Sequence, residues 1–207
     1  MYTPQQEAFL EAITKKVQNF FEEHPLKGHE FDHAYRVQEN IKEIAQRENK
    51  KDVWLYEVSA LLHDIGRVTE HYTLNNTTRH HELSYELLKV WFNEDRVFDF
   101  LTLEQKKELL YGVRYHWNDA ADEYESAIFL RDADKIDLLG NIGIERTCAF
   151  LNNDEHAINE DVVKKYYCYY WIRTEAAKNI VKENSLIEQV DDFFIPRLRS
   201  YVKGVEL

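Results

Sequence analysis

Apolar residues recur at helical spacing along nearly the whole chain, and little in the sequence interrupts them. The 207 residues include only 6 glycines and 3 prolines, so residues that break helices are scarce. Strand signals are scarce as well. The sequence therefore predicts an all-α fold, and its length suits a single domain, residues 1–207, that buries a proper core.

Capping residues and breaks predict where the helices lie. The first helix should end at His24-Pro25, and Asp52 should begin a helix that ends at Gly66. The segment from Arg67 to His80 has loop chemistry, and we expect it to form a mobile rim. The remaining helices are expected at about 29–44, 81–91, 103–116, 126–139, 140–151 and 161–183.

The dipeptide His63-Asp64 places two polar side chains in an otherwise apolar helical run. A carboxylate among Leu61, Leu62 and Ile65 costs several kcal/mol of desolvation unless it is paired or bound to a cation. Imidazole and carboxylate ligands without a thiolate suit Mn, Fe, Co, Ni, Zn or Mg. The pair is therefore a candidate for part of a divalent metal site.

Other residues could complete such a site. His33 lies on the apolar face of its predicted helix, and Asp134 shares a face with core leucines. His81 and His116 lie between these two segments. Each residue also has a structural explanation: the histidines could be hydrogen-bonded core residues, Asp64 could cap the turn at Gly66, and Asp134 could pair with a cation on its helix.

The motifs around these residues resemble those of the HD-domain metal-dependent phosphohydrolase superfamily, and in particular a short single-domain bacterial subgroup. The resemblance rests on His-x-x-x-His-x-x-Arg-Val at 29–37, Leu-Leu-His-Asp-Ile at 61–65 and Asp-Ala-Asp-Lys-Ile-Asp-x-x-Gly at 132–140. It continues through Ile142-Gly-Ile-Glu-Arg146 and Arg173-Thr-Glu-Ala-Ala177, so nearly the whole chain is covered. It implies an HD helical bundle with a core at about 25–145 and C-terminal helices at about 146–207.

The resemblance also implies roles for particular residues. His33, His63, Asp64 and Asp134 would be the metal ligands, and Asp64 would also orient or deprotonate the attacking water. His29, Asp132 and Asp137 would hold the ligands in orientation.

Two histidines leave the number of metal ions open. Relatives that bind two metals place further histidines between the His-Asp pair and the final aspartate, where His81 and His116 also lie, whereas the short subgroup resembles single-metal hydrolases. We interpret the site as mononuclear, with His81 and His116 as catalytic groups or substrate contacts. His71 and His80 are interpreted as ordinary loop histidines.

The formal net charge of −12 argues against general binding to nucleic acid or to an anionic membrane. A small phosphorylated substrate remains compatible with this charge if local cations contact it. Cations near the candidate ligands in sequence are the expected substrate-binding residues: Arg36, Arg67, Arg114 and Lys135.

The predicted function is hydrolysis of a nucleotide or similar small phosphate ester by metal-activated water, as in a nucleotidase or nucleotide pyrophosphohydrolase. The alternatives are a di-iron oxygenase, which would need His81 and His116 as ligands, and a nucleotide-sensing module without turnover.

The run Tyr166-Tyr-Cys-Tyr-Tyr-Trp171 is aromatic around most of a helix. We interpret it as helix–helix core, with a homodimer surface or a lid over the substrate as alternatives. Cys148 and Cys168 are interpreted as reduced core residues, which together with the lack of a signal peptide or membrane span predicts a cytoplasmic protein.

Overall fold

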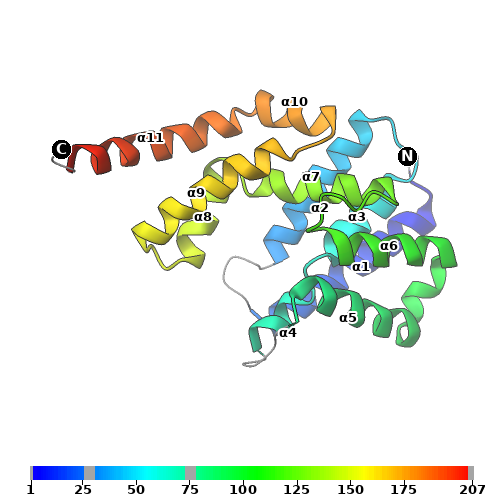
Figure 1. Ribbon diagram of the computed structural model, residues 1–207. Coiled ribbons are helices and arrows are strands. Elements are labelled where there is room, and N and C mark those ends of the chain that lie inside the picture. Colours follow the sequence, from blue (N-terminus) through cyan, green and yellow to red (C-terminus); the bar gives the residue numbers. More distant parts are fainter. Residues whose placement is uncertain (1, 26–30, 73–77, 205–207) are drawn as a thin grey trace.

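The computed structural model describes residues 2–25, 31–72 and 78–204, and the regular structure within these ranges is entirely helical (Figure 1). This confirms the all-α prediction. The helices are α1 Pro4–Glu23, α2 Phe31–Arg47, α3 Val53–Leu62, α4 Arg67–Tyr72, α5 His80–Glu94, the 3-10 helix η1 Arg96–Phe100, α6 Leu103–Tyr115, α7 Glu125–Asp137, α8 Gly140–Phe150, α9 Glu155–Tyr170, α10 Glu175–Glu183 and α11 Leu186–Gly204.

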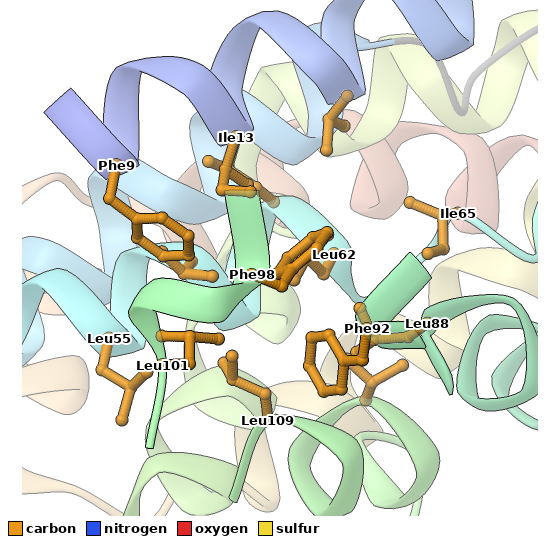
Figure 2. Packing of buried hydrophobic residues seen from close by; sticks show 14 of the residues in the cluster. Phe9, Ile13, Leu55, Leu62, Ile65, Leu88, Phe92, Phe98, Leu101 and Leu109 are labelled. Atoms are coloured by element: carbon orange, nitrogen blue, oxygen red, sulfur yellow. The ribbon is translucent and has the colours of Figure 1, made fainter. Parts of the chain in front are cut away.

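Helix α3 is the centre of the fold, because all ten of its residues are buried. One hydrophobic cluster joins α3 to α1, α5, η1 and α6, and includes Phe9, Leu62 and Phe98 (Figure 2). A second cluster joins α3 to α2, α7 and α10. Packing on both sides fixes the C-terminal end of α3, where His63 and Asp64 follow, against α2 and α7.

Several boundaries differ from the sequence-based expectation, including the end of α3, which lies at Leu62 rather than at Gly66. Residues 67–72 form the short helix α4 rather than a loop, while residues 73–77 of the expected mobile rim lie outside the described ranges. The helix expected over 161–183 begins earlier, at Glu155, and is broken after Tyr170. The hydroxyl of Thr174 accepts from Ala177 N and so starts α10 as a separate helix.

The C-terminal helices α8, α9 and α11 share a smaller cluster of Ile144, Val162 and Val190. Buried Lys165 on α9 links this helix to the end of α7 and to α8, since its Nζ donates to Leu138 O at 2.9 Å and to Gly143 O at 2.9 Å. No described helix is both long and apolar enough to cross a membrane.

The aromatic run on α9 is mostly not core, contrary to our interpretation. Tyr166 is half-buried against Phe194, but Tyr167, Tyr169, Tyr170 and Trp171 are exposed. Cys148 and Cys168 are half-buried and form no disulfide.

Candidate metal centre

Three segments bring the four expected metal ligands together. His33 comes from the first turn of α2, His63 and Asp64 follow α3, and Asp134 lies on α7. His33 Nε2 lies 3.7 Å from Asp64 Oδ2 and 3.4 Å from Asp134 Oδ1. His63 Nε2 lies 3.6 Å and 3.9 Å from the same two oxygens. Nitrogen and carboxylate oxygen therefore surround one small space.

Hydrogen bonds on the outer side of each ring fix which nitrogen faces this space. His33 Nδ1 lies 2.7 Å from Asp137 Oδ2, and His63 Nδ1 lies 2.7 Å from Ala60 O. Because a carbonyl or carboxylate oxygen only accepts, both Nδ1 atoms carry the proton and each Nε2 presents a lone pair inward. His63 Nε2 is buried without a hydrogen-bond partner among the described residues. A buried lone pair facing two carboxylates fits a bound cation.

The protonation states agree with this assignment. Burial lowers the pKa of His33 and so keeps its ring neutral, although Asp137 opposes the shift. Burial raises the pKa of Asp134, but attraction to the protonated forms of His63 and His33 outweighs burial, so the net pKa lies below its usual value. Neutral imidazole and ionised carboxylate are the states that metal binding requires.

A second polar cluster, made of Asp64, His80 and His116, adjoins the candidate metal ligands and shares Asp64 with them. His80 at the start of α5 and His116 at the end of α6 face the other carboxylate oxygen, with Nε2 atoms 3.5 Å and 3.7 Å from Asp64 Oδ1. Their own Nε2 atoms are 3.2 Å apart. Burial lowers the pKa of His80 to about 3 and of His116 to about 4, so both rings are neutral near pH 7.

The expectation that His80 is an ordinary loop histidine is wrong. It begins α5 and faces Asp64, whereas the ring of its half-buried neighbour His81 packs against Trp117 in a tilted arrangement, with ring centroids 5.2 Å apart. The close approach of α5 to the turn at Gly66 sets this rotation. Gly66 N donates to Ser84 Oγ at 2.8 Å, and a Cβ at Gly66 would lie 2.2 Å from His80 O, so only glycine fits there.

Asp137 orients His33 and in turn accepts hydrogen bonds from two guanidinium groups. Arg36 Nε donates to Oδ1 at 2.6 Å, and Arg146 on α8 donates to Oδ2. Burial raises the pKa of this carboxyl, but the hydrogen bonds from His33 and Arg36 outweigh burial and hold the net pKa below its usual value. The sequence predicted roles for Asp137 and Arg36 but none for Arg146.

Glu70 on α4 is a further residue that the sequence reasoning missed. Its carboxylate accepts from His80 N at 3.1 Å, lies 3.4 Å from His80 Nδ1 and accepts from Arg67 Nη1 at 3.3 Å. It lies in the segment that was expected to be a loop, and a carboxylate three residues after a candidate cation on a helix was the available signal.

None of the described hydrogen bonds of Asp132 is with a candidate metal ligand. Its buried carboxylate accepts from Arg173 N, from Thr174 N at 2.7 Å and from the Thr174 hydroxyl at 2.8 Å. It therefore anchors the start of α10, and this corrects the expectation that it orients a ligand. His29 lies outside the described residues.

The expected substrate-binding cations all have carboxylate partners. Their nearest partners are Asp137 for Arg36, Asp64 for Arg67, Glu82 for Arg114 and Asp119 for Lys135. Of these cations, Arg67 contacts a candidate ligand directly, with its Nε 3.2 Å from Asp64 Oδ2.

Comparison with known proteins places this geometry in a family. The family model of the HD domain matches residues 31–139, which is more than half of the chain. The chain is 24% identical over 190 residues to the uncharacterized protein YpgQ of Bacillus subtilis (strain 168), covering 86% of this chain and 85% of that protein.

Solved structures share the whole fold. The structure of Bacillus subtilis YpgQ in complex with ADP has a TM-score of 0.69 at 20% identity and covers 98% of this chain and 100% of that one. A predicted HD superfamily hydrolase from an uncultured Thermotogales bacterium has a TM-score of 0.65 at 24% identity, covering 92% and 91%. An HD-superfamily hydrolase from Bacillus thuringiensis has a TM-score of 0.68 at 21% identity, covering 97% and 100%. The chain belongs to the HD domain family and has the all-α fold of its hydrolases.

Proposed function

We propose that this protein is a metal-dependent phosphohydrolase that acts on a nucleotide or a similar small phosphate ester. The observation that carries the proposal is the convergence of His33, His63, Asp64 and Asp134, in which the buried Nε2 of His63 has no hydrogen-bond partner among the described residues. These four residues would hold the ion. A divalent ion there would supply the Lewis acidity that lowers the pKa of water and polarises a phosphoryl oxygen.

Asp64 faces both clusters with different oxygens. Oδ2 lies toward His33 and His63, and Oδ1 lies toward His80 and His116. In the proposed reaction Asp64 would therefore be among the residues that hold the ion, and it would also orient the attacking water or accept its proton. Arg67 contacts Asp64 from the partly exposed side, where it would meet a phosphate that approaches the centre.

A nucleotide is the favoured substrate class. The related YpgQ of Bacillus subtilis has been solved in complex with ADP, and its fold matches this chain over nearly its whole length. The overall net charge of −12 repels polyanions, so a small anion drawn to local guanidinium groups fits better than a nucleic acid. We further propose a cytoplasmic enzyme that works in one domain.

Two roles fit the second cluster. His116 Nδ1 lies 2.7 Å from Val113 O and therefore carries the proton, which leaves the His116 Nε2 lone pair facing Asp64 and His80. In a one-metal enzyme, His80 and His116 would contact the substrate, with His80 taking the place expected of His81. In a two-metal enzyme, both would be ligands together with Asp64.

The test is elemental analysis of protein purified without chelator or affinity metal, combined with phosphate and pyrophosphate release across a panel of nucleotides. We expect close to one divalent ion per chain and release of one of the two products. A value near two divalent ions per chain would indicate a two-metal mechanism and would leave the hydrolase assignment in place. Two irons with oxygen consumption and no phosphate or pyrophosphate release would favour the di-iron oxygenase, which the second cluster makes the main alternative.

A further inference from the structure

An indole lies exposed directly beside the candidate centre. Trp117 follows His116 in sequence and keeps 58% of its surface exposed. A tryptophan side chain stabilises a fold mainly through the apolar area that it buries, so this residue contributes little to the core. Its position next to a residue of the second cluster suggests a role in binding.

His81 holds this indole in a defined orientation. The two rings have centroids 5.2 Å apart and an interplanar angle of 33°. They come from different elements, since His81 is in the first turn of α5 and Trp117 follows α6. The imidazole covers part of the indole, and the high exposure of Trp117 shows that much of the ring remains open to solvent.

The paired rings lie next to His80 and His116, the residues that would contact the phosphate of a substrate. Consecutive residues on a helix point about 100° apart, so His80 faces Asp64 while His81 faces Trp117. The His81 ring lies 5.4 Å from His80 and 6.3 Å from His116, measured between centroids. A planar apolar surface therefore lies one ring beyond the groups that would contact a phosphate, within the length of one nucleotide.

We propose that Trp117, supported by His81, is the platform on which the nucleobase of the substrate stacks. This inference rests on the proposed function and specifies its substrate class: a phosphate ester that carries an aromatic base. Because every base has a π-face, stacking tolerates different bases. The platform would therefore separate nucleotides from base-free phosphates without selecting strongly among the bases.

The test compares ADP with inorganic pyrophosphate as calorimetric probes of the metal-loaded protein. Trp117→Ala should weaken ADP binding roughly 5- to 150-fold, the usual range for losing one base–aromatic stack, and leave pyrophosphate binding unchanged. Trp117→Phe should restore most of the ADP affinity. Leu103→Ala is the matched control, because it removes an exposed apolar side chain from the far end of α6. Circular dichroism checks the fold of each variant.

The outcomes separate the platform from the proposed hydrolase. Equal weakening of ADP and pyrophosphate, or no weakening of either, in Trp117→Ala would overturn the platform. Trp117-dependent ADP binding without turnover would support the platform and refute the hydrolase. Hydrolysis of base-free phosphate esters by a protein that does not bind ADP would refute the platform and keep the hydrolase. A wild-type protein that binds neither probe would refute both.

Discussion

Replacing Asp137 with asparagine tests how the centre is held in place. The Asp137 carboxylate fixes the ring of His33 through a hydrogen bond of 2.7 Å and is almost completely buried. A hydrogen bond to a charged group contributes about 1.5–3 kcal/mol, against about 0.5–1.5 kcal/mol for a neutral pair. The difference is about 1 kcal/mol, so Asp137→Asn should weaken metal binding roughly fivefold, just below the usual 10- to 100-fold effect of losing such a partner.

The matched control is Asp132→Asn, on the same helix and equally buried. Its carboxylate contacts Arg173 N and Thr174 instead of a candidate ligand. We therefore expect it to lower the free energy of unfolding, measured in urea, while leaving metal affinity within about twofold of the wild type. Calorimetric titration with Mn²⁺ gives the affinities. The reasoning fails if Asp132→Asn weakens metal binding as much as Asp137→Asn, or if Asp137→Asn has no effect on it.

Three further predictions concern the histidines. His63→Ala should abolish metal binding and hydrolysis with little change in circular dichroism, and retained metal in elemental analysis would refute the assignment. His80→Ala should lower kcat at least tenfold, while His81→Ala should mainly raise the KM for nucleotides. Steady-state kinetics measure both, and the reverse pattern would contradict the orientation of α5. In chelator-treated protein, the unfolded state binds more protons than the folded state between pH 4 and 6.5, because the folded-state pKa of His116 is about 4 against 6.5 when unfolded. The free energy of unfolding should thus fall by about 2 kcal/mol from pH 7 to pH 5 through this residue, and urea unfolding that is independent of pH would refute it.

Helical periodicity was enough to predict the all-α class, whereas the set of His33, His63, Asp64 and Asp134 was implied by the resemblance to the HD superfamily. Each of these residues interrupts or heads an apolar stripe, and an apolar stripe faces the core. The stripes alone therefore predict that these side chains face inward. That they meet at one point was implied by the resemblance and is seen in the structure, where α2, the end of α3 and α7 bring them together.

The choice between His80 and His81 was missed although the sequence contained a signal. Ser84 and Leu88 follow His80 at steps of four residues, and both are buried. The same steps from His81 lead to Tyr85 and Lys89, which carry polar or charged ends. Helical periodicity thus favours His80 as the inward residue. Asking which face continues into apolar residues would have decided between them.

The roles of Asp132 and Asp137 could not be separated in this way, because both are buried on α7. Their difference depends on what other elements bring to them. Asp137 meets His33 and two guanidinium groups, whereas Asp132 meets the backbone at 173–174, where α9 and α10 are separated. The break after Tyr170 was itself not predicted, since the aromatic run has no glycine or proline to mark it. A carboxylate that anchors an unexpected helix start cannot be assigned before that start is known.

The contacts of Asp137 also show how the C-terminal helices support the candidate metal centre. Arg146 on α8 donates to Asp137, and Lys165 on α9 donates to the carbonyl of Leu138, the next residue along the chain. The orientation of His33 is therefore set by groups from α8 and α9 as well as from α2. Movement of these helices would displace Asp137 and weaken the hold on His33. The C-terminal helices thus act as part of the support for the metal centre, although none of its four candidate ligands comes from them.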